Sequence, residues 1–146
     1  MSKTIRLFVI LAIATTLVAA NDERPGWLGA AMAQHRVSSD STRVDWLTVR
    51  GIEAGGPAAL GGLKMQDVIV AIDGKTIDFA NLAESLRTFD SFRAGKPVKF
   101  TVARGTARIT VTVIPARMTD AQYESWKFNR AQAKHQIEAE AAMKKP

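Results

Sequence analysis

The feature that most constrains the fold is the segment 56–74, in which a very short helix and a very short strand follow one another between glycines. Pro57 suits the first position of a helix, where its missing N–H costs nothing. Gly61-Gly62 stops that helix, because glycine accepts the left-handed conformation of a helix end. The apolar run Val68–Ile72 then predicts a strand, which the Asp73-Gly74 turn ends. Elements this short predict a small mixed domain.

Alternating apolar residues before and after this segment predict further strands. The strands expected are residues 27–34, 44–52, 68–72, 75–77, 98–104 and 109–113. Two of the connections between them have a clear character. The polar stretch 34–42 predicts a loop, and Gly105-Thr106 predicts the turn of a closing hairpin.

Residues 79–89 carry apolar side chains at helical spacing, which predicts an amphipathic helix. Together with the short helix described above, this gives an α+β fold: two helices on five to six antiparallel strands, as a small sandwich or partly open barrel. Beyond it, Thr119 and Gln122 match a capping box, which predicts a C-terminal helix. We expect the Tyr123 and Trp126 end of this helix to dock on the domain and the rest to fray.

Residues 1–20 have the order of a secretory signal peptide. A basic start with Lys3 and Arg6 precedes an uncharged apolar run, and small residues end at Ala20. The uncharged run 7–20 is shorter than the roughly 20 residues that a membrane span needs. Cleavage after Ala20 is therefore favoured over a membrane anchor. The sequence predicts a periplasmic or secreted protein without a stable membrane span in its mature form.

The composition narrows the chemistry. The chain has 146 residues and no cysteine, which excludes disulfides, thiol chemistry and thiolate metal sites. The formal net charge of +6 comes from dispersed residues rather than a basic block, so we expect no nucleic-acid partner. The length favours one domain. The expected parts are a signal peptide at 1–20, a linker at 21–25, the domain at 26–118 and a helical tail at 119–146.

Four segments of the domain carry a family resemblance. They are Gly26-Trp27-Leu28-Gly29-Ala30, Gly55-Gly56-Pro57-Ala58-Ala59-Leu60-Gly61-Gly62-Leu63-Lys64, Asp67-Val68-Ile69-Val70-Ala71-Ile72-Asp73-Gly74 and Val98–Arg104. In this order and spacing they resemble PDZ domains, in the version found in trimming and quality-control proteases of the bacterial envelope. The two middle segments are specific in combination. The resemblance covers residues 26–115 and implies a stand-alone exported module that binds peptides.

The resemblance also implies a groove for the C-terminus of another chain. A glycine turn lets successive N–H groups converge on the peptide carboxylate, and the residues concerned are Leu28, Gly29 and Ala30. An extended peptide would then add a strand to the exposed sheet edge. The groove for its side chains is expected to consist of Ala31, Met32, Phe79, Leu82, Ala83 and Leu86. Ordering costs offset much of the contact energy, so affinity on the order of micromolar is expected.

Two positions depart from the usual pattern of this family. Gln66 stands where glycine is usual, and a positive φ there strains a non-glycine residue by on the order of 1 kcal/mol. Phe79 stands near the first position of the groove helix, where some members have a histidine. Phenylalanine accepts no hydrogen bond from a peptide hydroxyl. We therefore predict apolar side chains at the final and third-last peptide positions.

Catalysis is not expected, because the sequence lacks a catalytic constellation. His35 and His135 lie far apart, neither an HExxH nor a Gly-x-Ser-x-Gly motif is present, and no metal or cofactor site is predicted. Two functions stay open. In the first, the groove captures peptide or protein C-termini. In the second, the chain is an adaptor or structural subunit of an envelope protease or secretion complex, and acts mainly through the helix at 119–146.

Overall fold

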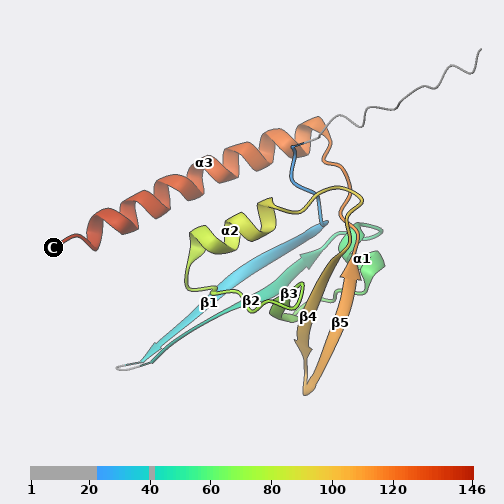
Figure 1. The fold of residues 1–146 in the computed structure, drawn as a ribbon, viewed down its shortest axis with the longest axis horizontal. Coiled ribbons are helices and arrows are strands. Elements are labelled where there is room, and N and C mark those ends of the chain that lie inside the picture. Colours follow the sequence, from blue (N-terminus) through green and yellow to red (C-terminus); the bar gives the residue numbers. More distant parts are fainter. Residues whose placement is uncertain (1–22, 40–41) are drawn as a thin grey trace, which may run out of the picture.

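The structure is a computed structural model, which describes residues 23–39 and 42–146. The expected signal peptide at 1–20 lies outside the described residues. The elements, in chain order, are β1 (Ala30–Ser39), β2 (Thr42–Ile52), α1 (Pro57–Gly61), β3 (Val68–Ile72), α2 (Leu82–Asp90), β4 (Val98–Arg104), β5 (Ala107–Val113) and α3 (Asp120–Met143) (Figure 1). No helix among the described residues is long and apolar enough to cross a membrane.

The five strands form one antiparallel sheet in which neighbours along the chain are also neighbours in the sheet, in the order β1-β2-β3-β4-β5. This confirms the predicted α+β fold. An isolated bridge between Trp27 and Ala116, with N···O distances of 2.8 and 2.9 Å, brings the chain entering β1 beside the chain leaving β5. The sheet therefore curls toward closure at one corner, while β1 remains an edge strand.

The short helix forms as its flanking residues predict. Gly56 is the N-cap, Pro57 opens the helix, and Gly62 at φ 95° ends it. Gly61 is required for a second reason, because a Cβ at that position would lie 2.5 Å from the Thr112 carbonyl oxygen of β5. The helix can thus approach β5 closely enough to bury Ala58 completely.

The core lies between the strands and the inner faces of α1 and α2. Its largest fully buried apolar side chains are Val49, Ile69, Phe100, Val102 and Val113. They come from four adjacent strands, so they join the sheet into one packed unit. Phe92 meets Phe100 edge to face at 5.9 Å between ring centroids and connects the end of α2 to this core.

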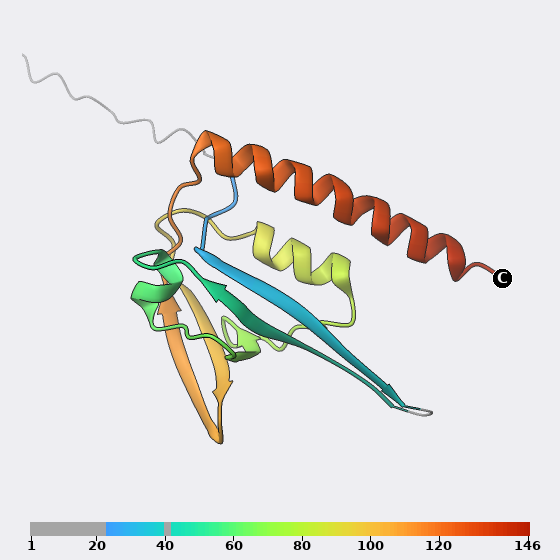
Figure 2. The same cartoon turned by 180° about the vertical axis from the view of Figure 1, so that it is seen from behind.

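The polar stretch 34–42 was expected to be a loop, and this expectation is wrong. β1 runs on to Ser39, β2 begins at Thr42, and the two strands pair throughout as an arm that projects from the body (Figures 1 and 2). Gln34, Arg36 and Val37 of the arm are exposed, so polar residues are tolerated there. Cross-strand pairs support it: the His35 ring stacks on Trp46, and Arg36 Nε lies 3.0 Å from an Asp45 carboxylate oxygen.

Two boundaries around α2 also differ from prediction. The expected return strand at 75–77 is reduced to one bridge between Ile72 and Lys75. The helix begins at Leu82 rather than at Phe79, because the Asn81 side chain accepts a hydrogen bond from the Glu84 N–H and caps the helix there. Phe79 precedes the helix and is packed into the core, with 7% of its surface exposed.

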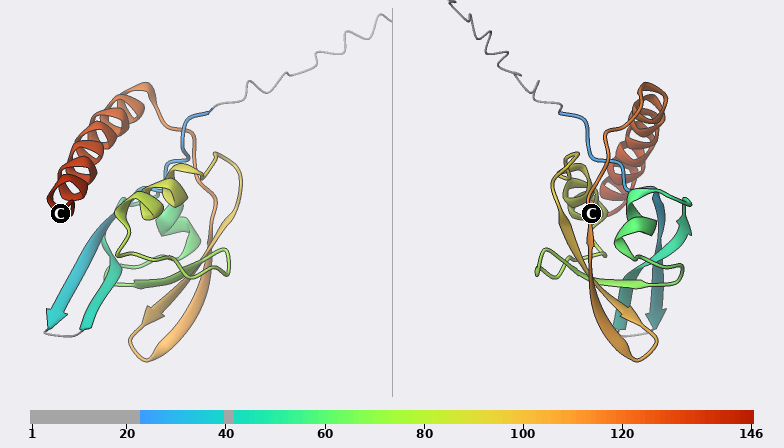
Figure 3. Two further views of the ribbon diagram at one scale, coloured as in Figure 1. Left: turned by 60° about the vertical axis from the view of Figure 1, so that its left-hand side comes forward. Right: turned by 90° about the vertical axis from the view of Figure 1, so that its right-hand side faces the viewer.

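The C-terminal helix begins with the predicted capping box between Thr119 and Gln122. Its first turns dock on the domain as expected, since the Trp126 Nε1–H donates to an Asp90 carboxylate oxygen at 3.2 Å. The expected fraying beyond this point is wrong, because the helix continues to Met143. Its alanine, glutamine, glutamate and lysine residues are good helix formers. Figure 3 shows α3 running beside α2, on the side where β1 lies.

Candidate peptide groove

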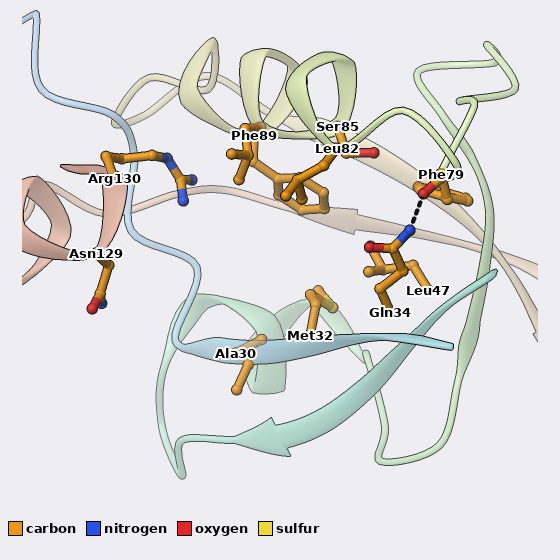
Figure 4. Close-up of a pocket in the computed structure, with 12 residues that line it drawn as sticks. Ala30, Met32, Gln34, Leu47, Phe79, Leu82, Ser85, Phe89, Asn129 and Arg130 are labelled. Carbon is orange, nitrogen blue, oxygen red and sulfur yellow. Dashed lines mark hydrogen bonds between the residues drawn. The ribbon is translucent and has the colours of Figure 1, made fainter. Parts of the chain in front are cut away.

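A cavity of about 500 Å³ separates β1 from α2. Its lining comes from β1, β2, α2 with the residue Phe79 before it, and α3: Ala30, Ala31, Met32 and Gln34 of β1, Leu47 of β2, Phe79, Leu82, Ser85, Leu86 and Phe89 of α2, and Asn129 and Arg130 of α3. Figure 4 shows Met32 reaching from β1 toward the side chains of α2. The walls are mainly apolar, so the cavity suits apolar side chains of a ligand.

The far end of the groove is bounded by a polar contact. The Gln34 side-chain amide of β1 donates a hydrogen bond to the Phe79 carbonyl oxygen, which precedes α2 (Figure 4). This contact ties the two walls together where β1 leaves the body of the domain. The groove therefore ends at this hydrogen bond and does not continue along the whole length of β1.

The loop at residues 27–29 directly precedes Ala30, the first residue of β1, which lines the groove. Its carbonyl groups are all occupied, Trp27 O by the Ala116 N–H at 2.9 Å, Leu28 O by the Ala58 N–H at 2.8 Å and Gly29 O by the Glu53 N–H at 2.8 Å. These bonds fix the peptide planes of the loop. The N–H groups of Leu28 and Gly29 have no acceptor among the described residues. The fold thus leaves these two donors without a backbone acceptor.

The pairing of β1 with β2 supplies a third donor. Ala30 lies opposite Ile52, and the hydrogen bond from Glu53 to Gly29 shows that this is a non-hydrogen-bonded pair. The N–H and C=O of Ala30 itself therefore point away from β2, toward the free edge of the sheet. The N–H groups of Leu28, Gly29 and Ala30 thus have no backbone acceptor among the described residues.

Gly29 is the residue that allows this turn. Its φ is +67°, a conformation that side chains rarely adopt, and a Cβ would lie 3.3 Å from Pro57 Cδ. Any larger residue would displace either the loop or the start of α1.

Most residues predicted for the groove meet there, but their roles differ. Met32, Leu82 and Leu86 line it, and Ala31 lies at its rim as an exposed residue. Phe79 contributes from below as a core residue, and Leu82 takes the first position of the helix. Ala83 does not line the groove but a separate pocket between α2 and α3.

Sequence reasoning missed several lining residues. Phe89 follows Leu86 at helical spacing, so the apolar stripe of the helix was enough to find it. Asn129 and Arg130 belong to α3, and the sequence gives no signal that this helix reaches the groove. The structure also shows no group of three or more metal-ligating side chains among the described residues.

An edge strand that faces an amphipathic helix across an apolar slot defines a class of small domains to which an extended chain can add. The family model for the PDZ domain matches residues 26–114 of this chain. The chain therefore belongs to the PDZ domain family. Comparison with curated proteins finds no match.

Solved structures with the same fold contain bound peptides. The HtrA-type protease AlgW with a decapeptide has a TM-score of 0.51 at 24% identity, and the alignment covers 66% of this chain and 30% of that one. A variant of the same protease with a decapeptide gives 0.52 at 26% identity, with 67% and 31% coverage. The PDZ domain of a carboxy-terminal protease from Vibrio cholerae with a peptide gives 0.44 at 22% identity, with 65% and 97% coverage. This chain thus spans about a third of the length of the AlgW chains.

Proposed function

We propose that this protein binds the C-termini of extended peptides, which add as a strand to the free edge of β1. The single observation that carries the proposal is the loop before β1. Its carbonyls are held by the fold, while the N–H groups of Leu28, Gly29 and Ala30 are left to an outside acceptor. A peptide carboxylate supplies that acceptor with its charge, and charge-assisted bonds contribute about 1.5–3 kcal/mol each.

The groove next to these amides would select apolar side chains. A final apolar side chain fits among Met32, Leu86 and Phe89, and a third-last one fits near Leu82. Burying each would contribute about 1.5–3 kcal/mol, from which the ordering of the peptide subtracts. The solved neighbours with bound peptides are consistent with this use of the fold.

We further propose that the protein works outside the cytoplasm, as a bacterial periplasmic or secreted module that has no enzymatic activity of its own and serves an envelope protease or secretion component. Support for export comes from the signal-like residues 1–20, and the link to an envelope protease rests on the likeness of the fold to the AlgW structures. N-terminal sequencing of the exported protein tests the first point. The mature chain is expected to begin at Asn21.

Peptide binding is tested by titrating the mature protein with a labelled library of decapeptides, each made as the free acid and as the amide. Free acids with apolar final and third-last residues are expected to bind at about micromolar affinity, and their amides at least tenfold more weakly. Equal binding of the two forms would reject carboxylate capture.

Gly29→Ala provides the matched test within the protein, with Gly105→Ala as its control. Both glycines have positive φ, 67° and 60°, but an added Cβ meets Pro57 only at Gly29 and nothing within 4 Å at Gly105. Gly105→Ala should lose about 1 kcal/mol of stability from its positive φ, and Gly29→Ala somewhat more because its Cβ also meets Pro57. Only Gly29→Ala should lose peptide affinity, by tenfold or more.

A further inference from the structure

The helix α3 lies along the mouth of the groove and borders both of its walls. Near the carboxylate-binding end, Asn129 and Arg130 line the cavity together with Ala30. Toward the other end, Gln136 and Glu140 of α3 line a pocket with Gln34 and Arg36 of β1. A further pocket between Ala83 of α2 and Ile137 of α3 places the same helix beside α2.

This position brings α3 into conflict with a long peptide. A strand added to β1 lies roughly 4.8 Å from it. Side chains alternate along such a strand, so one set enters the groove and the other set points away from it. Because α3 occupies the mouth, the outward set of a peptide longer than a few residues would meet the helix.

The attachment of α3 is suited to release. None of its residues is buried. Its inner face is held at one place above all, where Arg130 makes a bidentate ion pair with Asp90 of α2 and Trp126 donates to the same carboxylate. Figure 4 shows the Arg130 side chain extending from α3 toward α2.

The start of the helix is anchored separately. Met118, just before it, is buried with 8% of its surface exposed. Arg24 Nη1 lies 2.7 Å from an Asp120 carboxylate oxygen and its guanidinium lies over the Tyr123 ring. The helix can therefore leave the groove while its first turn stays on the domain.

We propose that α3 is a displaceable cover of the peptide groove, latched by Asp90 and Arg130, and that peptide binding and docking of α3 exclude one another. The inference rests on the proposed function of the groove. The expected effect on peptide affinity follows from the fraction of molecules with an open groove. If α3 covers the groove about nine-tenths of the time, the apparent affinity is about tenfold below that of the open groove.

A charge swap in the full mature chain tests the proposal. Asp90→Arg and Arg130→Asp each break the latch, and the double variant reverses the pair. Lys134→Asp is the control, since it makes the same charge change as Arg130→Asp at a side chain that is 76% exposed. The probe is the free-acid decapeptide that binds each variant most tightly in the library, and fluorescence anisotropy gives its affinity.

Both single variants are expected to bind the peptide about tenfold more tightly than the wild type, and the double variant and Lys134→Asp within about twofold of it. In parallel, hydrogen exchange of the amides after Trp126 in α3 should accelerate in the single variants alone. Weaker binding by Arg130→Asp, not restored in the double variant, would make Arg130 a peptide contact and overturn the cover.

Peptide affinity and amide exchange together distinguish a failure of the proposed cover from a failure of the proposed peptide binding. If exchange shows that α3 is released while the affinity is unchanged, the cover is rejected and peptide binding stands. If exchange is the same in all variants, Asp90 and Arg130 do not latch the helix and the proposal is wrong. If no variant binds any peptide, with α3 docked or released, the proposed function itself is rejected.

Discussion

Two carboxylate–guanidinium pairs in this protein have nearly the same geometry and opposite surroundings. Arg104 Nη2 lies 2.7 Å from an Asp67 oxygen, and Arg130 Nη2 lies 2.7 Å from an Asp90 oxygen. The two arginine side chains are equally exposed, at 28% and 27%. The carboxylates differ: the Asp67 side chain is 1% exposed and that of Asp90 is 30%.

The difference shows what each pair connects. Asp67 also accepts the Lys64 N–H at 2.9 Å, and Arg104 also donates to the Gly62 carbonyl at 2.9 Å, so this pair fastens the turn after α1 to β4. Among the described residues, the Asp90 carboxylate accepts hydrogen bonds from two side chains of α3, Trp126 and Arg130. One pair lies within the domain, and the other joins the domain to an element without a buried residue. An aspartate–arginine ion pair can thus stabilise the domain itself, as Asp67–Arg104 does, or attach a helix to its surface, as Asp90–Arg130 does.

Replacing each aspartate by asparagine should give the largest contrast. Asp67→Asn leaves a buried amide facing Arg104, and is expected to lower the free energy of unfolding by about 2–4 kcal/mol. Asp90→Asn acts on a partly exposed pair and should cost about 1 kcal/mol or less. Urea unfolding followed by circular dichroism measures both. Equal losses would show that burial of the carboxylate does not decide the strength of the pair.

The pH dependence of the free energy of unfolding should also distinguish the buried Asp67 from exposed carboxylates. Burial raises the pKa of the Asp67 carboxyl, but hydrogen bonds from Arg104 and the Lys64 amide, with the Arg104 charge, outweigh it and hold the pKa below its ordinary 3.8. A lowered folded-state pKa gives stability that is fully present above the unfolded-state value and is lost as pH falls through the folded-state value.

Wild-type stability should therefore decline as pH falls below about 4, and Asp67→Asn should decline less steeply. Urea unfolding at a series of pH values measures the slopes. Asp120→Asn is the control: hydrogen bonding to Arg24 lowers the pKa of Asp120 too, but the group is exposed, so its removal should change the slope less. A slope unaltered by Asp67→Asn would contradict the assignment.

The parts of the fold that sequence predicted are those set by local rules. Pro57 and Gly61-Gly62 define α1, and Thr119 with Gln122 defines the start of α3, because caps and glycine turns act within a few residues. The β1–β2 arm was missed because residues 34–42 are a nearly continuous polar run, which is typical of a loop, and only pairing with the opposite strand shows that they form strands.

The candidate site divides in the same way. Ala30, Met32, Leu82 and Leu86 line one cavity, whereas Leu28 and Gly29 belong to the loop before β1 and do not line it. The roles of Asp67, Asp90 and Arg130 depend on partners 37 to 40 residues away along the chain, so no local pattern indicates them. Contacts of that range require tertiary structure.

Gln66 directly precedes Asp67, the buried member of the Asp67–Arg104 pair, and tests how firmly the turn beside this pair is held. Its φ is +69°, and its N–H is held by the Val49 carbonyl at 2.8 Å. The backbone strain persists because these neighbouring bonds over-determine the turn. Gln66 is exposed, so Gln66→Gly loses little packing and should raise the free energy of unfolding by about 0.5–1 kcal/mol. An unchanged urea midpoint would show that glutamine fits the turn without strain.

Salt should give the smallest effect and should act on one pair alone. The Debye length falls from about 10 Å at 0.1 M to about 3 Å at 1 M, which weakens exposed ion pairs far more than buried ones. Raising sodium chloride across this range is expected to speed amide exchange in the second half of α3 by about two- to fivefold, since about 0.4–1 kcal/mol of attraction is at stake. Exchange in β3 and β4, on either side of Asp67 and Arg104, should not accelerate.

In Arg130→Asp the salt dependence of amide exchange in α3 should disappear or reverse, because the attraction between residues 90 and 130 has become a repulsion. Acceleration of both regions together would mean that salt loosens the whole domain and that the two pairs are not separate units.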